Sequence, residues 1–218
     1  MLPRFYPILD TAVLAARGYG PVAAAEVLLE TGVRILQYRH KPAFTQAHFD
    51  EAREIAKLCA AAGAFFVMND RADFALLLAR EGGRCGVHLG QADLPVASAR
   101  RVVGSDIVIG YSTHNERPLR NAAPQPADYL ALGPIFGTTS KEQPDPVVGI
   151  ENLQKWRSLS AKPLVAIGGI TLGTAPAVLG AGADAVAIIG GLFQEPGLAG
   201  LKNLSRVWLD LTGAPLAS

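Results

Sequence analysis

The most constraining feature of this chain is a regular alternation of short apolar runs with amphipathic, helix-like segments. The apolar runs, rich in Val, Ile and Leu, lie at 6–10, 33–39, 65–70, 86–90, 106–112, 128–134, 163–169 and 184–190. The helix-like segments lie at 21–31, 45–63, 71–83, 95–104, 115–123, 149–160, 171–182 and 197–211. Several of the runs are apolar on both faces, as buried parallel strands are.

Strand followed by helix, repeated through 218 residues, predicts an α/β protein with a (β/α)8 TIM barrel at the small end of its size range. A doubly wound open sheet is the alternative. Such a sheet would more often carry a G-x-G-x-x-G turn after its first strand, and residues 9–20, LDTAVLAARGYG, do not form one. Because no linker or low-complexity segment interrupts the pattern, we predict a single domain over 1–218.

Composition and charge exclude several classes of function. A formal net charge of +1 gives no electrostatic footprint for nucleic acid or a membrane surface. No apolar run is long enough to cross a bilayer, and the first ten residues lack the layout of a signal peptide. Cys59 and Cys85 have no metal or redox spacing and indicate reduced thiols. We therefore expect a cytoplasmic protein with small-molecule partners, and leave a homodimer open.

Polar residues gather where the predicted strands end. In residues 36–41, LQYRHK, the side chains of Gln37, Arg39 and Lys41 fall on one face of an extended chain. Active sites of such barrels lie at the carboxyl ends of the strands. The other strands lead into polar or glycine positions at Asn69, Asp70, Asp93, Ser112, His114, Thr138, Ser140, Lys141, Gly168, Gly169, Gly190 and Gly191.

The charges in this set indicate a diphosphate site. Arg39 can grip two phosphate oxygens in a fork, whereas Lys41 and Lys141 act as point charges. Asp70 and Asp93 suit Mg²⁺, which proteins usually hold through one or two carboxylates together with substrate phosphates.

The glycines at the ends of the last two strands suit a second anion. Barrels frequently bind phosphate at these loops, against backbone N–H groups, and glycine lets the backbone approach closely. Two anion sites on one rim suggest an enzyme that joins a diphosphate substrate to a monophosphate substrate.

Single residues of the set also have simpler interpretations. Asp70 could be a helix cap, Asp93 a turn residue, and Gly168–Gly169 a tight turn. For His88, inside a strand, a satisfied structural histidine is favoured over a catalytic one. His114 lies past a strand end, where a histidine could move a proton.

Seven motifs, in this order, resemble the thiamine phosphate synthase family over nearly the whole chain: QYRHK, MNDRADFALLL, GVHLGQADLP, GYSTH, YLALGPIFGTTSK, AIGGIT and AGADAVAII. The resemblance implies a (β/α)8 barrel transferase of thiamine biosynthesis. It implies that hydroxymethylpyrimidine diphosphate is condensed with hydroxyethylthiazole phosphate, with Mg²⁺, to thiamine phosphate and pyrophosphate. The implied reaction is dissociative, with pyrophosphate leaving before the thiazole nitrogen attacks.

The resemblance also assigns roles to residues. The catalytic residues it implies are Arg39, Lys41, Ser112 and Lys141, and the metal ligands are Asp70 and Asp93. It places Gln37, Arg39, Lys41, Asn69 and Lys141 around the pyrimidine diphosphate, with Ser112 near the reacting pyrimidine and its leaving group. It places the thiazole phosphate at Thr138, Ser140, Gly169, Ile189 and Gly190.

The chain departs from the family pattern at four positions. Gly137 and Ser140 stand where Pro and Thr are expected, and His40 stands where an acidic residue is common. Gly190 stands where a serine is usual, so a hydroxyl donor to the phosphate is lost there.

Two other functions compete with the synthase. The thiazole tautomerase family resembles this chain in fold, with a similar barrel. It is expected to lack the acidic pair that Asp70 and Asp93 supply here. A non-catalytic thiazole-phosphate-binding relative would not need the cations Arg39, Lys41 and Lys141.

Overall fold

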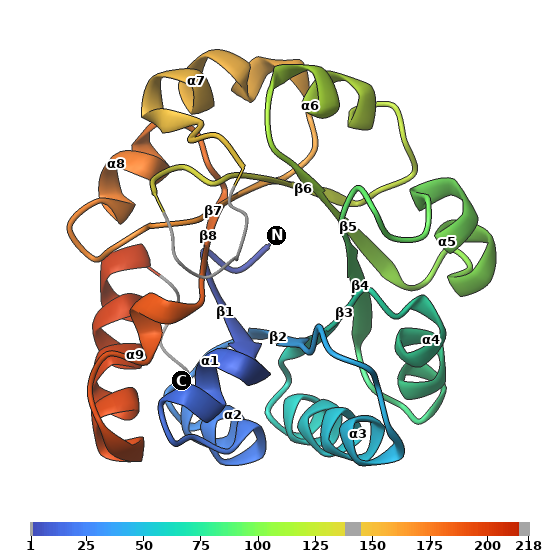
Figure 1. The fold of residues 1–218 in the computed structure, drawn as a ribbon, viewed down its shortest axis with the longest axis vertical. Helices are drawn as coiled ribbons and strands as arrows, with labels where there is room; N and C mark the ends of the chain where they lie inside the picture. The colour runs from blue at the N-terminus through green and yellow to red at the C-terminus, as the bar shows by residue number, and fades with distance from the viewer. Residues whose placement is uncertain (1, 138–144, 214–218) are drawn as a thin grey trace.

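The computed structural model, which describes residues 2–137 and 145–213, is a closed barrel of parallel strands (Figure 1). The strands follow one another around the barrel in chain order, and the last pairs with the first. They are β1 (Phe5–Asp10), β2 (Ile35–Arg39), β3 (Phe65–Asn69), β4 (Cys85–Leu89), β5 (Val108–Thr113), β6 (Tyr129–Leu132), β7 (Leu164–Ile167) and β8 (Ala185–Ile188). The predicted (β/α)8 barrel is confirmed, and the doubly wound alternative is excluded.

Helices form an outer ring around the strands (Figure 1). They are α1 (Thr11–Ala16), α2 (Pro21–Glu30), α3 (Gln46–Ala61), α4 (Ala72–Arg80), α5 (Val96–Val103), α6 (Glu116–Ala122), α7 (Gly149–Trp156), α8 (Ala175–Gly180) and α9 (Gly197–Thr212), with short 3-10 turns η1 (Arg157–Leu159) and η2 (Gly190–Leu192). Each predicted helical segment contains a helix. Helix α1 was not predicted; the Asp10 carboxylate caps it by accepting the N–H groups of Ala12 and Val13.

The apolar residues form two cores, one on each side of the sheet. The larger core lies between strands and helices and includes Leu36, Tyr38 and Phe66. The smaller one fills the barrel interior with residues such as Tyr6, Val67 and Tyr129. Because side chains alternate along a strand, residues next to each other in sequence serve different cores. This explains why the strands are apolar on both faces.

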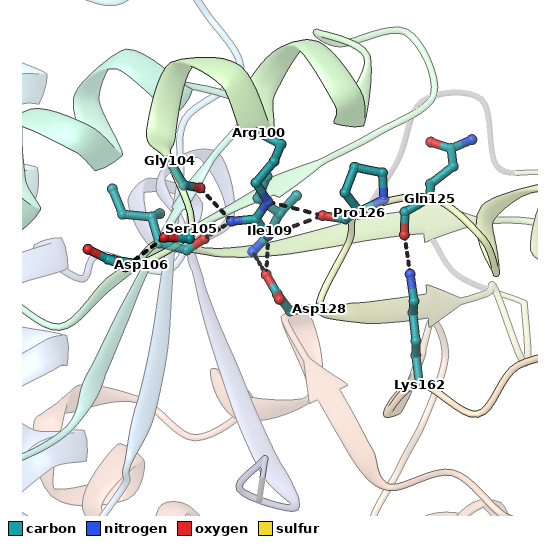
Figure 2. A network of polar contacts seen from close by, with 10 residues as sticks. Arg100, Gly104, Ser105, Asp106, Ile109, Gln125, Pro126, Asp128 and Lys162 are labelled. Carbon is teal, nitrogen blue, oxygen red and sulfur yellow. Dashed lines mark hydrogen bonds and ion pairs between the residues drawn. The ribbon is translucent and has the colours of Figure 1, made fainter.

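Arginine–aspartate pairs tie neighbouring strands together at the amino ends of the barrel. Arg100 of α5 donates to the backbone carbonyl oxygens of Gly104, Ile107 and Pro126 and to the Asp128 carboxylate (Figure 2). The same carboxylate oxygen of Asp128 accepts the N–H of Ile109 at 2.6 Å. These residues therefore fix where β5 and β6 begin, at the end opposite to the predicted site.

The same device recurs two strands further on. Arg157 donates to the carbonyl oxygens of Gly182 and Ser160 and to the carboxylate of Asp184. Asp184 also accepts the N–H of Leu164 at 2.8 Å. Since the aspartate precedes the strand directly in both cases, the residue pattern explains how the ends of β7 and β8 are aligned.

Replacing Arg100 by alanine is expected to destabilise the barrel by about 2 kcal/mol, because four acceptors lose a charged donor. Arg101→Ala is the matched control, since the neighbouring Arg101 is exposed and its contact is a 3.3 Å bond to Ser98 of the same helix. Urea unfolding of both variants measures the difference. Equal free energies of unfolding for the two variants would contradict the role given to Arg100.

Stability is expected to fall as the pH rises above about 9. Burial raises the pKa of Tyr6, Tyr38 and Tyr129 above the ordinary value, and raises the pKa of Cys59 and Cys85 to about 12. In the unfolded chain these groups lose their protons at lower pH, so the unfolded state binds fewer protons. Each group then costs about 1.4 kcal/mol of stability per pH unit above its unfolded pKa. Urea unfolding between pH 7 and 11 checks this, and a flat profile would contradict it.

Cys59 and Cys85 are buried free thiols, as predicted. Across the described ranges 2–137 and 145–213, none of the helices combines the length and the apolar character that crossing a bilayer requires.

Candidate active site

A cavity of about 760 Å³ opens at the carboxyl ends of the strands. Its size is in the range of small-molecule sites. The predicted residues that line it are Gln37, Arg39, Lys41, Asn69, Asp70, Asp93, Ser112, Gly169, Ile189 and Gly190. Thr138, Ser140 and Lys141 lie outside the described residues. The rule that polar strand ends converge on one rim therefore holds for every predicted site residue that the structure describes.

Arg39 is held by a carboxylate that sequence reasoning missed. Its guanidinium donates to the Asp10 carboxylate, and the side chains are 16% and 5% exposed. Asp10 ends β1 and pairs with Arg39 in the sheet register. Because Asp10 also caps α1, it fixes the guanidinium relative to two elements and leaves the rest of the fork to face the cavity.

Asp70 and Asp93 form an acidic pair beside Lys41. The ammonium of Lys41 lies 2.5 Å from an oxygen of Asp70. Burial, and the hydrogen bond with Asp93, raise the pKa of Asp70 to about 6, while the pKa of Asp93 is lowered by its bonds to Asp70 and the Gly90 N–H in spite of burial. Without a divalent cation, the two carboxylates thus hold a proton more tightly than one isolated aspartate would.

The backbone positions both members of this pair. Asp70 has φ 64°, a left-handed conformation that is uncommon outside glycine and often marks functional sites. It is not the helix cap that its sequence position allowed, since α4 begins after Arg71. Asp93 is a turn residue, as its sequence position allowed: its carboxylate accepts the Gly90 N–H at 2.7 Å. Its turn role and its place beside Asp70 are therefore compatible.

Asn69 presents a buried donor to the cavity. Its side-chain nitrogen Nδ2 has no hydrogen-bond partner among the described residues, although Asn69 is only 4% exposed. An unpaired buried amide costs free energy, and ligands commonly satisfy such groups. The amide lies next to Asp70 on the cavity wall. It is therefore suited to donate to a bound oxygen.

Gln37 and Ser112 are joined to each other through the barrel interior. Gln37 bonds to Tyr6, Tyr6 to Tyr129, Tyr129 to His88, and His88 to Ser112. Both ring nitrogens of His88 are engaged in this series, in agreement with the satisfied histidine that the sequence favoured. His88 nevertheless lines the cavity, as does Tyr6.

His114 also lines the cavity, and its Nδ1 contacts two acceptors. The ring nitrogen lies 2.9 Å from the carbonyl oxygen of Gly133 and 3.5 Å from the carboxylate of Asp145. A carbonyl oxygen only accepts, so Nδ1 carries a hydrogen. Whether His114 moves a proton remains a prediction.

The glycines that end β7 are required by the neighbouring loop. A Cβ at Gly168 would overlap Pro134, and one at Gly169 would overlap Phe136 and the carbonyl of Gly137. Both glycines have positive φ, and the loop is bonded to β7 through Ile135 N–H to Ile167 O. The close approach of backbones explains both glycines without a ligand, so the phosphate site there stays a prediction.

The segment after β8 forms a single turn. Residues Gly190–Leu192 make one 3-10 turn, η2, and α9 begins only at Gly197. Ile189, Gly190 and Gly191 all line the cavity. Arg17, the C-cap residue of α1, also lines this cavity and is a cation that the sequence analysis did not assign to the site.

A profile of the family described as thiamine monophosphate synthase matches residues 5–192. The thiamine-phosphate synthase of Koribacter versatilis is 44% identical over 202 residues, covering 89% of this chain and 91% of the relative. That of Chloroflexus aurantiacus is 38% identical, with 96% and 94% covered.

Solved structures share the fold of this chain. The thiamine phosphate pyrophosphorylase of Pyrococcus furiosus superposes with a TM-score of 0.79 at 28% identity, over 95% of this chain and 96% of that one. The tryptophan synthase α-subunit of the same organism has a TM-score of 0.69 at 15% identity, which is a likeness of fold alone.

Proposed function

The chain belongs to the thiamine monophosphate synthase family, and from this premise we propose how it makes thiamine phosphate. The substrates are hydroxymethylpyrimidine diphosphate and hydroxyethylthiazole phosphate, and the second product is pyrophosphate. The observation that carries the proposal is the acidic pair of Asp70 and Asp93 beside Lys41 and Arg39 on one cavity wall. An isomerase or a silent binding protein acting on a thiazole phosphate alone would have no use for this wall.

The donor set fits Mg²⁺. Two close carboxylates, whose interaction helps to raise the pKa of the buried Asp70, offer the hard oxygen ligands that this ion prefers. Among the described residues, no cluster of three or more His, Cys, Asp or Glu side chains forms a metal cage. A site of two carboxylates completed by substrate phosphate is therefore the fitting one. When bound, Mg²⁺ would neutralise charge on the diphosphate and on the departing pyrophosphate.

The diphosphate is bound by the residues around this pair. Arg39, fixed by Asp10, offers a guanidinium fork, and Asn69 offers its unpaired amide hydrogens. Lys41 is placed to exchange its contact with Asp70 for a phosphate oxygen. Lys141 is assigned to the same group from its motif alone.

The chemistry needs no nucleophile from the protein. The bond between the pyrimidine methylene carbon and the diphosphate oxygen breaks first, and both electrons leave with pyrophosphate. The aminopyrimidine ring delocalises the positive charge of the methylene carbon, and the thiazole nitrogen then forms the new C–N bond. Arg39, Lys41, Lys141 and Ser112 stabilise the negative charge that develops on the leaving group. Holding the two rings in contact supplies the rest.

The thiazole phosphate binds at the opposite side of the rim. Backbone N–H groups of Gly169, Ile189 and Gly190 are its assigned donors, with the hydroxyls of Thr138 and Ser140. The support is that the three residues on the ends of β7 and β8 line the same cavity as the diphosphate wall. A bare backbone suits a phosphate because N–H groups donate without a side chain in the way.

Withholding one substrate at a time tests this assignment. With Mg²⁺ and both substrates, the protein should form thiamine phosphate. With the thiazole phosphate alone it should release no isomer of it. An isomer formed in the absence of the pyrimidine diphosphate would favour the tautomerase alternative and overturn the proposal.

A further inference from the structure

Five polar side chains form a continuous hydrogen-bonded chain inside the barrel. The Nε2 of Gln37 lies 2.9 Å from the hydroxyl of Tyr6, which lies 2.9 Å from the hydroxyl of Tyr129. The Tyr129 hydroxyl lies 3.0 Å from Nδ1 of His88, and Nε2 of His88 lies 2.8 Å from Oγ of Ser112. Gln37, Tyr6, His88 and Ser112 line the cavity, and the hydroxyl-bearing Tyr6 and Tyr129 are only 1% and 2% exposed.

The Tyr129 ring fits into the barrel only because the residue beside it in the sheet is a glycine. Gly110 of β5 pairs with Tyr129 of β6 in the sheet register, and a Cβ at Gly110 would overlap the Tyr129 ring. The Tyr129 ring also stacks on His88 and meets Tyr6 edge-on. Hydroxyls buried this deeply are costly unless each is bonded, and a low dielectric strengthens the bonds that are made.

The protons along the chain can be arranged in two fully bonded ways. Each hydroxyl has one hydrogen to donate, and a neutral imidazole has one N–H and one bare nitrogen. The direction of one bond therefore fixes the direction of all the others. In the forward arrangement Gln37 donates from its amide nitrogen, both tyrosines donate onward, and His88 donates from Nε2 to Ser112. In the reverse arrangement every donor becomes an acceptor.

The two arrangements present different groups to the cavity. In the forward one, Gln37 is left with its carbonyl oxygen, and Ser112 is left with its hydroxyl hydrogen. In the reverse one, Gln37 is left with its NH₂ group, and the hydrogen of Ser112 is spent on His88. The amide nitrogen of Gln37 points to Tyr6 in the structure, which is the forward arrangement.

We infer that this series of hydrogen bonds couples recognition of the substrate's exocyclic amine at Gln37 to stabilisation of its leaving diphosphate at Ser112. Tyr6, Tyr129 and His88 are then positioning residues. The inference rests on the proposed function, which places the leaving diphosphate at Ser112, and it adds that the aminopyrimidine ring lies against Gln37 on the same cavity wall. An amine donates to the Gln37 carbonyl and holds the forward arrangement, in which Ser112 donates to a diphosphate oxygen.

A pyrimidine with a carbonyl oxygen in place of the amine reverses the chain. Two oxygens would face each other at Gln37, so the amide must turn and offer its NH₂ group. The reverse arrangement then removes the hydrogen that Ser112 gives to the leaving group. The hydrogen-bonded series thus lets Ser112 donate to the leaving group of an amino pyrimidine but not to that of an oxo pyrimidine.

Tyr129→Phe tests the coupling, because it keeps the ring and removes one link. We expect kcat to fall about tenfold, the size of one hydrogen bond made in the transition state, with KM for the thiazole phosphate unchanged. The preference for binding the amino over the oxo pyrimidine diphosphate should fall by a similar factor. Tyr38→Phe is the matched control: Tyr38 is equally buried, but its hydroxyl donates to Glu51, outside the barrel interior.

If Tyr129→Phe is poorly folded, Tyr6→Phe/Tyr129→Phe replaces it. The double substitution removes the Tyr6 hydroxyl that the single one leaves without an acceptor, and the Gln37 amide that then loses Tyr6 lies at the cavity wall, where water or a ligand can bond it. It should show the same loss of kcat and of preference. A folded variant with wild-type kcat and wild-type preference, while the wild type makes thiamine phosphate, overturns the coupling and leaves the proposed function standing. A wild type that makes no thiamine phosphate overturns the proposed function, and the inference with it.

The tautomer of His88 is a second, direct readout. With ¹⁵N-labelled histidine and thiamine phosphate bound as the aminopyrimidine probe, NMR should find the His88 proton on Nε2. The chain has only 4 histidines, so His88→Gln assigns the signal. A proton found on Nδ1 instead would mean the reverse arrangement and would contradict the inference.

Discussion

Asp93→Asn is expected to lower the turnover of thiamine phosphate synthesis by ~10²-fold or more at saturating Mg²⁺, because one of two metal carboxylates becomes a neutral amide. Folding should change little. The amide oxygen of asparagine can still accept the Gly90 N–H that Asp93 accepts now. The variant also removes the partner that helps to raise the pKa of Asp70, so the metal-free protein should melt no lower than the wild type.

Steady-state turnover and thermal melting, each with and without Mg²⁺, measure this. In the wild type, Mg²⁺ with pyrophosphate should raise the melting temperature, and Asp93→Asn should abolish the shift. Asp73→Asn is the matched control, since Asp73 is an exposed carboxylate paired with Arg71 that lies outside the cavity lining. A well-folded Asp93→Asn protein with near-normal turnover would show that Asp93 holds no metal.

Arg39→Lys is expected to be the second most damaging change, with turnover reduced by ~10–10²-fold although the charge is kept. A lysine cannot both contact Asp10 and offer a fork to the leaving pyrophosphate. Because the buried Asp10 retains a cation beside it, stability should fall less than in Arg39→Ala, which leaves that carboxylate unpaired.

Arg34→Lys serves as the control. Arg34 directly precedes the first residue of β2, at the end of the strand away from the cavity, and donates to the carbonyl of Ala62. Its turnover should match that of the wild type. The assignment of Arg39 to the leaving group would be contradicted if Arg39→Lys changed only the KM for the thiazole phosphate.

Periodicity predicted the barrel because each strand must be apolar toward two cores. The chain order of strands in a barrel then required no further information. Helix α1 is hard to predict because it has only 6 residues and its main signal is the N-cap at Asp10. Asp10 is also the last residue of β1, so its second role is not visible in the pattern. Most of the other helices are shorter than the predicted segments, as with the segment 171–182, in which only Ala175–Gly180 is helical.

The site was predicted where strand-end polarity is visible in one strand at a time. By that same rule Asp10 at the end of β1 could have been found, but its pairing with Arg39 depends on register between strands. Tyr6 and Tyr129 could not be found this way, since an inward tyrosine in an apolar run looks like any other core aromatic. The glycines at the end of β7 illustrate the opposite case, in which a residue chosen for an anion is already required by backbone packing.

The acidic and basic residues of the cavity wall are expected to catalyse the joining of two phosphorylated substrates. The most direct test of this expectation is a time course of purified protein with hydroxymethylpyrimidine diphosphate, hydroxyethylthiazole phosphate and Mg²⁺, in which thiamine phosphate and pyrophosphate are both quantified. We expect the two products to appear in a one-to-one ratio. Both should form far more slowly than with the wild type and Mg²⁺ when the Mg²⁺ is chelated, or when the Asp93→Asn variant is used. Pyrophosphate released without thiamine phosphate, or no product from well-folded protein, would contradict the account.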